Sequence, residues 1–591
     1  MSESMVQDPK PKEVSESKRI PIYKSGDWFS QLFAYALLLV GVLAIPFPFN
    51  PIPDWVRGEF YPQYISSPLE VFASSYRAYF LLIPEAMDLT TGLLILLLDM
   101  VRPNRNSLRS PIIAQIGLIL SYFPVIFTMY LTTRYFNAAL GQYWGGLETI
   151  DPFSLFLKSV ALVTVNYVVV IAMRSKDLPE KFSGEFYAFL MFAVVAIECV
   201  VSSSDILAIY ILTEFVAITS YILVGWLKHK PTSTEAALKY FLLGSMSSAF
   251  MVFGFAIMYG LSGTTNLYEM KVALHQVRMQ DPSMVPVMLL SVLFFMVGIG
   301  FKLAIAPFHM YLPDVFSGSP TAVAAFLSVT PKLATVAVFV RVFLLGLSTV
   351  ADLWLPMMQI CAVLSMTIGN LFALRQTEMK RFLAYSSISH MGYMLIGLCA
   401  AGVVAESNAN ASVQSLGYMG MLHYMVVYAI MNTGAFLILS IVEHHTGGTE
   451  FRNFKGLVHR APPSAYTMLV IFLSFAGIPP IAGFAAKFFV LMPALETGVG
   501  LYPLAIIAII NMVISAYVYL RLIRTMFLER PEVETRFYPD ATYRYAMIPP
   551  FAFLAFYFIG GFFVRQLYAY AASSNFLTIN VYFGGGPTSG M

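Results

Sequence analysis

Long apolar stretches separated by short polar connections make up most of the chain. A bilayer core is crossed by about 20 apolar residues in an α-helix, and stretches of that length with few charged positions recur from residue 29 to residue 567. They predict about 15 transmembrane helices, at 29–47, 79–101, 112–133, 153–173, 186–203, 205–226, 236–261, 286–316, 321–346, 353–374, 381–402, 417–442, 464–494, 502–526 and 546–567. The pattern therefore indicates an all-α polytopic membrane protein.

Composition supports this fold class and narrows the chemistry. Of the 591 residues, 58% are hydrophobic and 12% are charged, whereas soluble domains carry roughly 25% charged residues. The net charge of +3 gives no reason to expect a nucleic-acid partner. Cys199, Cys361 and Cys399 show no C-x-x-C spacing, and the chain has no phosphate-binding loop or H-E-x-x-H motif. We therefore expect no metal and no cofactor on this chain, with any redox centre on another chain.

The distribution of positive charge predicts the orientation. Residues 1–28 form a polar tail in which lysines, arginines and acids balance, which does not resemble a signal peptide. If the tail is cytoplasmic, the connections on the same side carry most of the positive residues, in the groups at 102–109, 174–181, 228–230, 375–381, 452–460 and 530–544. The positive-inside rule then predicts a cytoplasmic N-terminus and a C-terminus outside.

Ionisable residues at mid-membrane depth are the candidate functional residues. Each costs about 2.5–3.5 kcal/mol at a helix centre, so each is expected to face a partner or a hydrated cavity. Glu214 is the only acid expected at the centre of its span, and four lysines follow along successive spans: Lys239, Lys302, Lys332 and Lys487. Lys239 is near a predicted helix boundary, where snorkelling to the headgroups is an equally good explanation.

Prolines interrupt two of the predicted spans beside these lysines. The stretch FKLAIAPFHMYLPD contains Lys302 and Pro307, and SFAGIPPIAGFAAKF places Pro479 and Pro480 before Lys487. Proline removes a backbone donor and clashes with the preceding turn, so both spans are predicted to be unwound, with freed carbonyls and water able to solvate a charge. Broken helices beside ionisable groups are typical of ion transporters.

Histidine and acidic residues elsewhere in the spans leave alternatives open. His390, in YSSISHMGY, is mid-helix, and it could relay protons between lysines or be a hydrogen-bonded core histidine. Glu198 is close to the end of the span 186–203, and we expect it at the membrane interface, with an auxiliary proton site as the alternative.

Several long strings resemble the antiporter-like, proton-translocating subunits of respiratory complex I. They are LTEFVAITSYILVG, STEAALKYFLLGSMSSAF, GIGFKLAIAPFHMYLPDVFSGSPTAVAAFLSVTPK, GNLFALRQTEMKRFLAYSSISHMGYMLIGL and SFAGIPPIAGFAAKF. The resemblance runs from about residue 79 to residue 567 and implies a 14-helix core with two inverted five-helix repeats and broken helices. A lysine at position 487 and the absence of a long lateral helix favour the quinone-side member of the family.

The resemblance also implies roles. The proton-translocating residues would be Glu214, Lys239, Lys302, Lys332 and Lys487. It places Glu214 and Lys302 together as a pair, and it continues a lateral hydrated path through Lys332, His390 and Lys487. The chain would then be a non-redox subunit of a complex I-like NAD(P)H (or other donor):quinone oxidoreductase in an energy-transducing membrane, most simply a prokaryotic cell membrane.

Partners and alternatives follow from the same resemblance. The expected partners are a middle antiporter-like subunit, small quinone-side subunits and the lipid bilayer, with quinone, iron–sulfur and flavin centres on partner chains. The alternative is a subunit of a multisubunit Na⁺/H⁺ antiporter, and a purely structural scaffold is disfavoured by five intramembrane ionisable groups. The expected division of the chain is a tail at 1–28, an extra helix and loop at 29–78, a core at 79–567 and a short tail at 568–591.

Overall fold

The computed structural model shows a helical bundle with one small hairpin. It describes residues 82–101, 108–134, 141–143, 147–175, 178, 183–407, 411–496, 501–531 and 536–557. The predicted tail at 1–28, the extra helix at 29–47 and the tail at 568–591 lie outside these residues, and so does the last part of the span 546–567. The proposed division of the chain therefore stays a prediction.

The helices follow one another with short connections. The first part contains α4 (Ile83–Val101), α5 (Arg109–Arg134), the strands β1 (Gly141–Tyr143) and β2 (Glu148–Ile150), α6 (Pro152–Met173), α7 (Ser183–Ser202), α8 (Ile206–Val224), α9 (Pro231–Ser262), α10 (Leu267–Gln280), α11 (Val285–Leu303), α12 (Leu312–Gly318) and α13 (Thr321–Phe339). The second part contains α14 (Ala351–Ala373), α15 (Met379–Ser407), α16 (Ala411–Thr446), α17 (Leu457–Arg460), α18 (Pro462–Ala476), α19 (Ala482–Glu496), α20 (Tyr502–Leu528) and α21 (Ala541–Ala555). Short 3₁₀ turns and a π-helical turn, Val340–Gly346, complete the connections.

The membrane-spanning character is confirmed, but the count of about 15 spans is not. Within the described residues, 11 helices are long and apolar enough to cross a membrane, and two shorter apolar helices accompany them, Pro462–Ala476 and Ala482–Leu495. The predicted spans 286–316 and 464–494 each form two helices rather than one, α11 with α12 and α18 with α19. The helix α10 and the β1–β2 hairpin were not predicted, because the apolar-span pattern does not report short amphipathic or extended connections.

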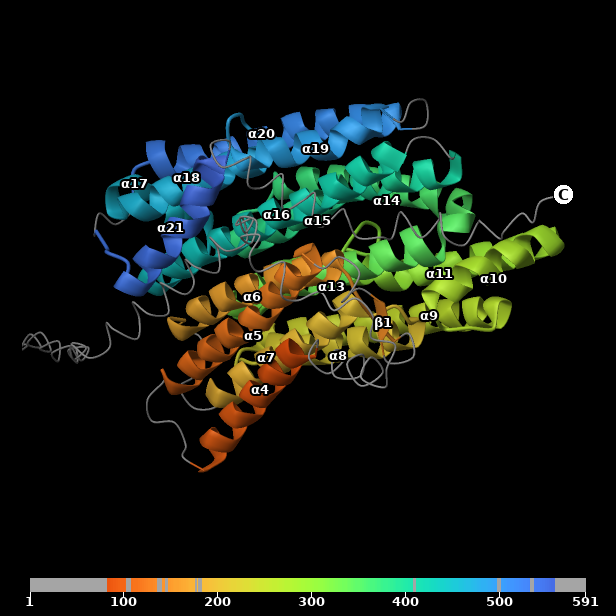
Figure 1. Ribbon diagram of the computed structural model, residues 1–591. Helices are drawn as coiled ribbons and strands as arrows, with labels where there is room; N and C mark the ends of the chain where they lie inside the picture. Colours follow the sequence, from red (N-terminus) through yellow and green to blue (C-terminus); the bar gives the residue numbers. More distant parts are fainter. Residues whose placement is uncertain are drawn as a thin grey trace, which may run out of the picture.

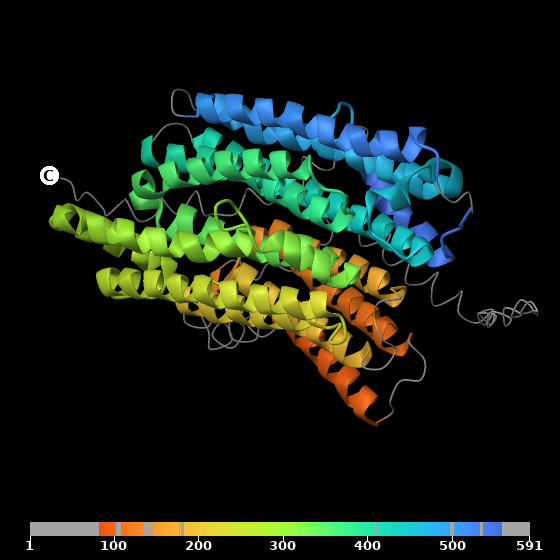
Figure 2. The same ribbon diagram turned by 180° about the vertical axis from the view of Figure 1, so that it is seen from behind.

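Two successive groups of five spans share one feature. In the order α7, α8, α9, α11–α12, α13 the fourth span is broken, and in the order α14, α15, α16, α18–α19, α20 the fourth is broken again. Because five is an odd number, the second group crosses the bilayer in the opposite sense, as the predicted inverted repeat requires. Figures 1 and 2 show the second group, in green to blue, stacked along one side of the first.

Each break begins where a helix ends in the left-handed conformation. α11 ends at Leu303 and Ala304 follows with φ 59°, while α18 ends at Ala476 and Gly477 follows with φ 79°. Pro307 and the Pro479–Pro480 pair lie in the two unwound segments. The predicted interruption of both spans is therefore confirmed.

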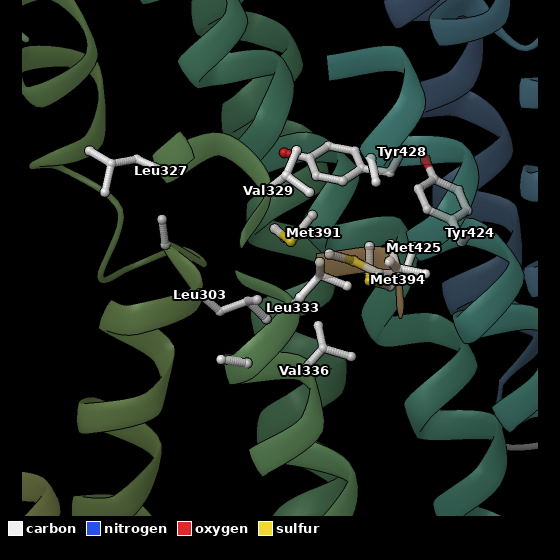
Figure 3. Packing of buried hydrophobic residues seen from close by; sticks show 14 of the residues in the cluster. Leu303, Leu327, Val329, Leu333, Val336, Met391, Met394, Tyr424, Met425 and Tyr428 are labelled. Carbon is white, nitrogen blue, oxygen red and sulfur yellow. The ribbon is translucent and has the colours of Figure 1, made fainter. Parts of the chain in front are cut away.

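Burial separates central from peripheral helices. In α6, α13, α15 and α16, 94% of the residues in the apolar 18-residue stretch of the helix are buried, compared with 39% in α9 and α20. Figure 3 shows the central packing, in which Leu333 and Val336 lie near Met391 and Met394. The peripheral helices instead expose large apolar side chains, among them Phe241, Met246, Ile510 and Val513. An apolar exterior of this kind matches a surface that contacts lipid or partner subunits.

Candidate functional site

The predicted partnership of Glu214 and Lys302 is present in the structure. α8 starts at the N-cap Asp205, whose carboxylate accepts from Leu207 N at 2.8 Å, and this start places Glu214 near the middle of the helix. Lys302 Nζ, in the last turn of α11, donates to Glu214 Oε1 at 2.7 Å. Ser248 Oγ of α9 donates to the same oxygen at 2.5 Å. The two charged side chains are 21% and 12% exposed, so the pair is largely withdrawn from solvent.

Lys239 makes a different set of contacts. It lies two turns inside α9, and its Nζ is 2.7 Å from Glu235 and 2.9 Å from Asp314 of α12. The lysine side chain is 44% exposed. Arg381 of α15 reaches the other oxygen of Asp314 at 2.8 Å. Lys239 therefore belongs to an open ion network around α12, and the snorkelling alternative stays open.

Lys332 is buried among hydroxyl groups. It is 1% exposed in the middle of α13, and its Nζ donates to Ser387 Oγ of α15. Ser387 Oγ is 2.6 Å from Tyr428 Oη, which donates to the carbonyl of Ser328 at 2.9 Å. Figure 3 shows Tyr428 directed toward this region from α16. The lysine therefore has a relay of hydroxyl groups beside it in place of a carboxylate.

His390 occupies the position between two lysines. It follows Ser387 by one turn of α15. Its imidazole ring interacts electrostatically with both Lys332 and Lys487. Its Nδ1 is 2.6 Å from Tyr424 Oη and its Nε2 is 3.2 Å from Tyr519 Oη. Both ring nitrogens therefore have hydroxyl partners, which fits a proton relay and equally a satisfied core histidine.

Lys487 is held by the end of a helix. Its Nζ donates to the carbonyls of Phe475 at 2.8 Å and Ala476 at 3.1 Å, the last residues of α18. The same atom is 5.1 Å from the centre of the Tyr393 ring. Backbone carbonyls at a helix C-terminus carry partial negative charge, and an aromatic face attracts a cation. The predicted role of freed carbonyls in solvating a charge is confirmed here.

The contacts of these groups can be arranged in the order that the sequence predicts. The order is Glu214 with Lys302, then Lys332 with Ser387, then His390, then Lys487. Among the described residues, no direct hydrogen bond links Lys302 to Lys332 or His390 to Lys487. Water or a side-chain movement has to close these steps if a proton is to pass along the row.

Three further acidic residues are buried in the bundle. Glu198, expected near the membrane interface, is 0% exposed, and it lies close to the end of α7. Glu85 and Asp88, in the first two turns of α4, are 4% and 0% exposed, and the span pattern did not single them out. Lys158 of α6 is a further buried charge, 2% exposed, that the analysis of the spans did not single out. The sequence did contain a signal for this cluster, because Glu85 and Asp88 are three residues apart in an apolar stretch and so share one face of a helix.

A polar cavity opens between the two groups of helices. It has a volume of about 520 Å³ and its lining includes Lys380, Glu443 and His444. Lys380 Nζ of α15 is 3.4 Å from Glu443 of α16. Glu443 also accepts a hydrogen bond from Thr321, the first residue of α13. The cavity therefore offers ionisable groups at the start of the helix that carries Lys332.

Broken spans beside buried lysines, arranged in two five-span groups, define an antiporter-like membrane subunit. Residues 203–515 match the family model described as NADH:quinone oxidoreductase/Mrp antiporter, transmembrane. The chain belongs to this family. It is similar to NADH-quinone oxidoreductase subunit N 2 of Solibacter usitatus, 37% identical over 66% of this chain and 76% of the relative, and to subunit N 2 of Symbiobacterium thermophilum, 36% identical over 77% and 89%.

Solved structures agree with this assignment. A chain of respiratory complex I from Thermus thermophilus with bound aureothin matches with a TM-score of 0.67 and 28% identity, over 83% of this chain and 100% of that one. A chain of the Mrp complex from Dietzia sp. matches with a TM-score of 0.70 at 18% identity, over 86% and 99%. The second likeness shows a shared fold. The resemblance inferred from the sequence is therefore confirmed.

Proposed function

We propose that the chain translocates protons as a membrane subunit of a complex I-like NAD(P)H (or other donor):quinone oxidoreductase. The observation that carries the proposal is the ion pair between Glu214 and Lys302, made at the point where α11 is interrupted. A lysine that gains and loses a carboxylate partner changes its affinity for a proton. The names of the relatives, which are subunits N of NADH-quinone oxidoreductases, support the same function.

The proposed path follows the row of groups already described. When Glu214 is beside Lys302, the lysine holds its proton, and when the carboxylate moves away, the proton is released toward Lys332. Ser387 and His390 would carry it on toward Lys487. Lys239 would modulate the first step through Asp314, on the segment that follows the break.

The energy for these steps would come from partner chains. We expect the chain to have no redox centre of its own, with quinone, flavin and iron–sulfur centres on neighbouring subunits. The neighbours would include a middle antiporter-like subunit and small quinone-side subunits in a prokaryotic cell membrane. The N-terminus would be cytoplasmic and the C-terminus outside, as the positive-inside rule predicts. A topology reporter fused to each terminus tests this orientation.

The function is tested by electron transfer and proton uptake in reconstituted vesicles. Glu214→Gln and Lys302→Ala should each lower both rates at least tenfold, roughly 1.4 kcal/mol in barrier terms. Glu214→Asp keeps the charge and should lose less. Arg278→Gln is the matched control, because Arg278 makes an ion pair with Asp352 at 2.6 Å outside the row. Wild-type rates in both pair variants, in an assembled complex, would contradict the proposal.

The antiporter alternative has its own outcome. A chain purified in mild detergent with quinone-site and iron–sulfur subunits supports the oxidoreductase assignment. A chain purified only with other antiporter subunits, in membranes that exchange Na⁺ for H⁺ without electron transfer, would replace it.

A further inference from the structure

A second group of buried charges lies away from the proposed path. It consists of Glu85 and Asp88 on α4, Lys158 on α6 and Glu198 on α7, and we call it the N-terminal cluster. The four side chains are between 0% and 4% exposed. None of them contacts Glu214 or Lys302 within the part of the chain that the structure describes. Ionised groups at this depth are costly unless each finds a partner, so their arrangement has to be explained.

The packing of α4 against α7 brings the acids together. Glu85 and Asp88 are three residues apart and lie on one face of α4. Gly92 continues that face one turn further on, and a Cβ placed there would be 2.8 Å from Phe192 Cε1 of α7. The missing side chain therefore permits the close approach of the two helices. Because Gly92 shares a face with Glu85 and Asp88, the acidic face of α4 is the one that packs against α7, the helix that carries Glu198.

The charges in the cluster do not balance. Lys158 Nζ donates to Glu85 Oε1 and forms an ion pair with it. Asp88 and Glu198 lie on α4 and α7, which pack against each other, and each carboxyl group acts electrostatically on the other. Ser121 of α5 lies beside Asp88, but its hydroxyl group donates to the carbonyl of Leu118 at 3.0 Å. Both oxygens of Asp88 and both oxygens of Glu198 are buried without a hydrogen-bond donor.

A proton bound by one of the two carboxylates would remove this excess of negative charge. Two adjacent carboxylates cannot donate a hydrogen bond to each other, and their repulsion adds to the loss of hydration. If one of them carries a proton, the repulsion disappears and a charge-assisted O–H···O⁻ hydrogen bond forms. The positive charge of Lys158 also acts on Glu198, which favours the one negative charge that remains on the pair.

We propose that Asp88 and Glu198 bind one proton between them and form a second proton-binding site of this protein, which exchanges with the membrane surface through Glu148 and Lys158. The inference goes beyond the path through Glu214 and Lys302, since none of that path's residues takes part.

Glu148 provides the connection to the surface. It lies in β2 and pairs with Ser203, directly after the end of α7. Burial raises the pKa of Glu148, against the effect of Lys158, and Glu85 raises it further while Arg341 lowers it. Glu148 therefore binds a proton at a higher pH than an exposed glutamate does. Lys158 contacts Glu85, and its charge also acts on Glu148 and Glu198, at the two ends of the proposed exchange route.

The bound proton is tested by infrared spectroscopy of the intact complex at neutral pH. A protonated carboxylic acid has a carbonyl stretch that a carboxylate lacks and that shifts in D₂O. The wild-type complex should show this band, and Asp88→Asn/Glu198→Gln should lose it. Asp99→Asn is the matched control on α4, because Asp99 lies 3.8 Å from Arg109 outside the cluster, and it should keep the band. Identical spectra of the wild type and the double variant would overturn the proposal.

The exchange route is tested by the number of protons taken up per electron. Glu148→Gln and Glu198→Gln should each lower this ratio by about twofold, because the proton relay to the surface is interrupted, while quinone reduction continues. An unchanged ratio in both variants would show that the proton does not exchange and would overturn the route. Loss of the infrared band on adding sodium at fixed pH would assign the site to a cation instead. Because the band is measured without turnover, its result is independent of the test on Glu214 and Lys302.

Discussion

The two broken spans solvate their lysines in different ways. At the α11–α12 break, Lys302 precedes the unwound segment and meets the carboxylate of Glu214 at 2.7 Å. At the α18–α19 break, Lys487 follows the unwound segment and meets the carbonyls of Phe475 and Ala476. The first lysine depends on a side chain from another helix, and the second depends on the backbone of its own span.

This difference gives the two lysines different capacities. A carboxylate on α8 can approach or leave, so the charge of Lys302 can be coupled to the position of Glu214. The carbonyls beside Lys487 are fixed by α18, so its environment stays the same unless the helix itself moves. In the proposed path, the first lysine would therefore be adjustable and the second fixed.

Removal of charge should distinguish the breaks most strongly. Glu214→Ala leaves Lys302 without its carboxylate and should destabilise the assembled protein by about 3–5 kcal/mol, because a buried charge is left uncompensated. Lys487→Met leaves neutral carbonyls without a donor and should cost about 1–3 kcal/mol. Thermal unfolding of the purified complex measures both effects.

The double variant Glu214→Ala/Lys302→Ala is the control for this comparison. Removal of both charges should restore part of the stability that Glu214→Ala loses. If the single and double variants unfold at the same temperature, the pair is not an energetic unit and the contrast between the two breaks is lost.

The glycine at the second break should be the next most sensitive position. Gly477 has φ 79°, and a Cβ there would be 2.9 Å from Cδ of Lys487. Gly477→Ala should therefore cost about 1–3 kcal/mol in backbone strain and should also displace the lysine. Slower proton uptake in this variant, at normal assembly, is the expected result. Gly260→Ala provides the control, since a Cβ there meets no atom within 4 Å.

Lys239→Ala should have a smaller effect on proton uptake. Its side chain is 44% exposed and shares Asp314 with Arg381, so one positive partner remains after the substitution. We expect a loss below the tenfold loss of Lys302→Ala, roughly 1.4 kcal/mol, in the same vesicle assay. A loss as large as that of Lys302→Ala would make Lys239 a proton carrier in its own right.

Ala304→Gly should change stability least. Its φ of 59° is unfavourable for a residue with a Cβ, and glycine would relieve about 1–2 kcal/mol. The substitution also removes a buried methyl group worth about 0.8 kcal/mol, so the net change should stay within about 1 kcal/mol. A large stabilisation in thermal unfolding would show that the strain at the first break is greater than at an ordinary left-handed residue.

Much of the candidate site could be predicted from the sequence, because the distance of a residue from the ends of its apolar span gives its depth in the membrane. Glu214, Lys332 and Lys487 are far from the ends of their spans, and a neighbouring proline marks an unwound segment. Both features follow from position along the chain and need no tertiary information. The long apolar helices of the described residues and both breaks were therefore predicted, whereas the short helix α10 and the separate halves of the broken spans were not.

The neighbours that each helix face meets could not be predicted from the sequence in the same way. Glu198 is near the end of its span, yet α7 is enclosed by other helices at that level, so the residue is buried. Lys158 was missed for the same reason, because α6 is apolar on all sides and its pattern does not show which face meets α4. Partners such as Glu85 become visible only when the helices are placed beside each other.

The ion network around Asp314 makes α12 a direct connection between two parts of the protein. This seven-residue helix follows the first break, and its carboxylate is bound on one side by Lys239 of α9 and on the other by Arg381 of α15. α9 belongs to the first five-span group and α15 to the second. One carboxylate on α12 therefore links the two five-span groups directly, beside the segment that carries Lys302.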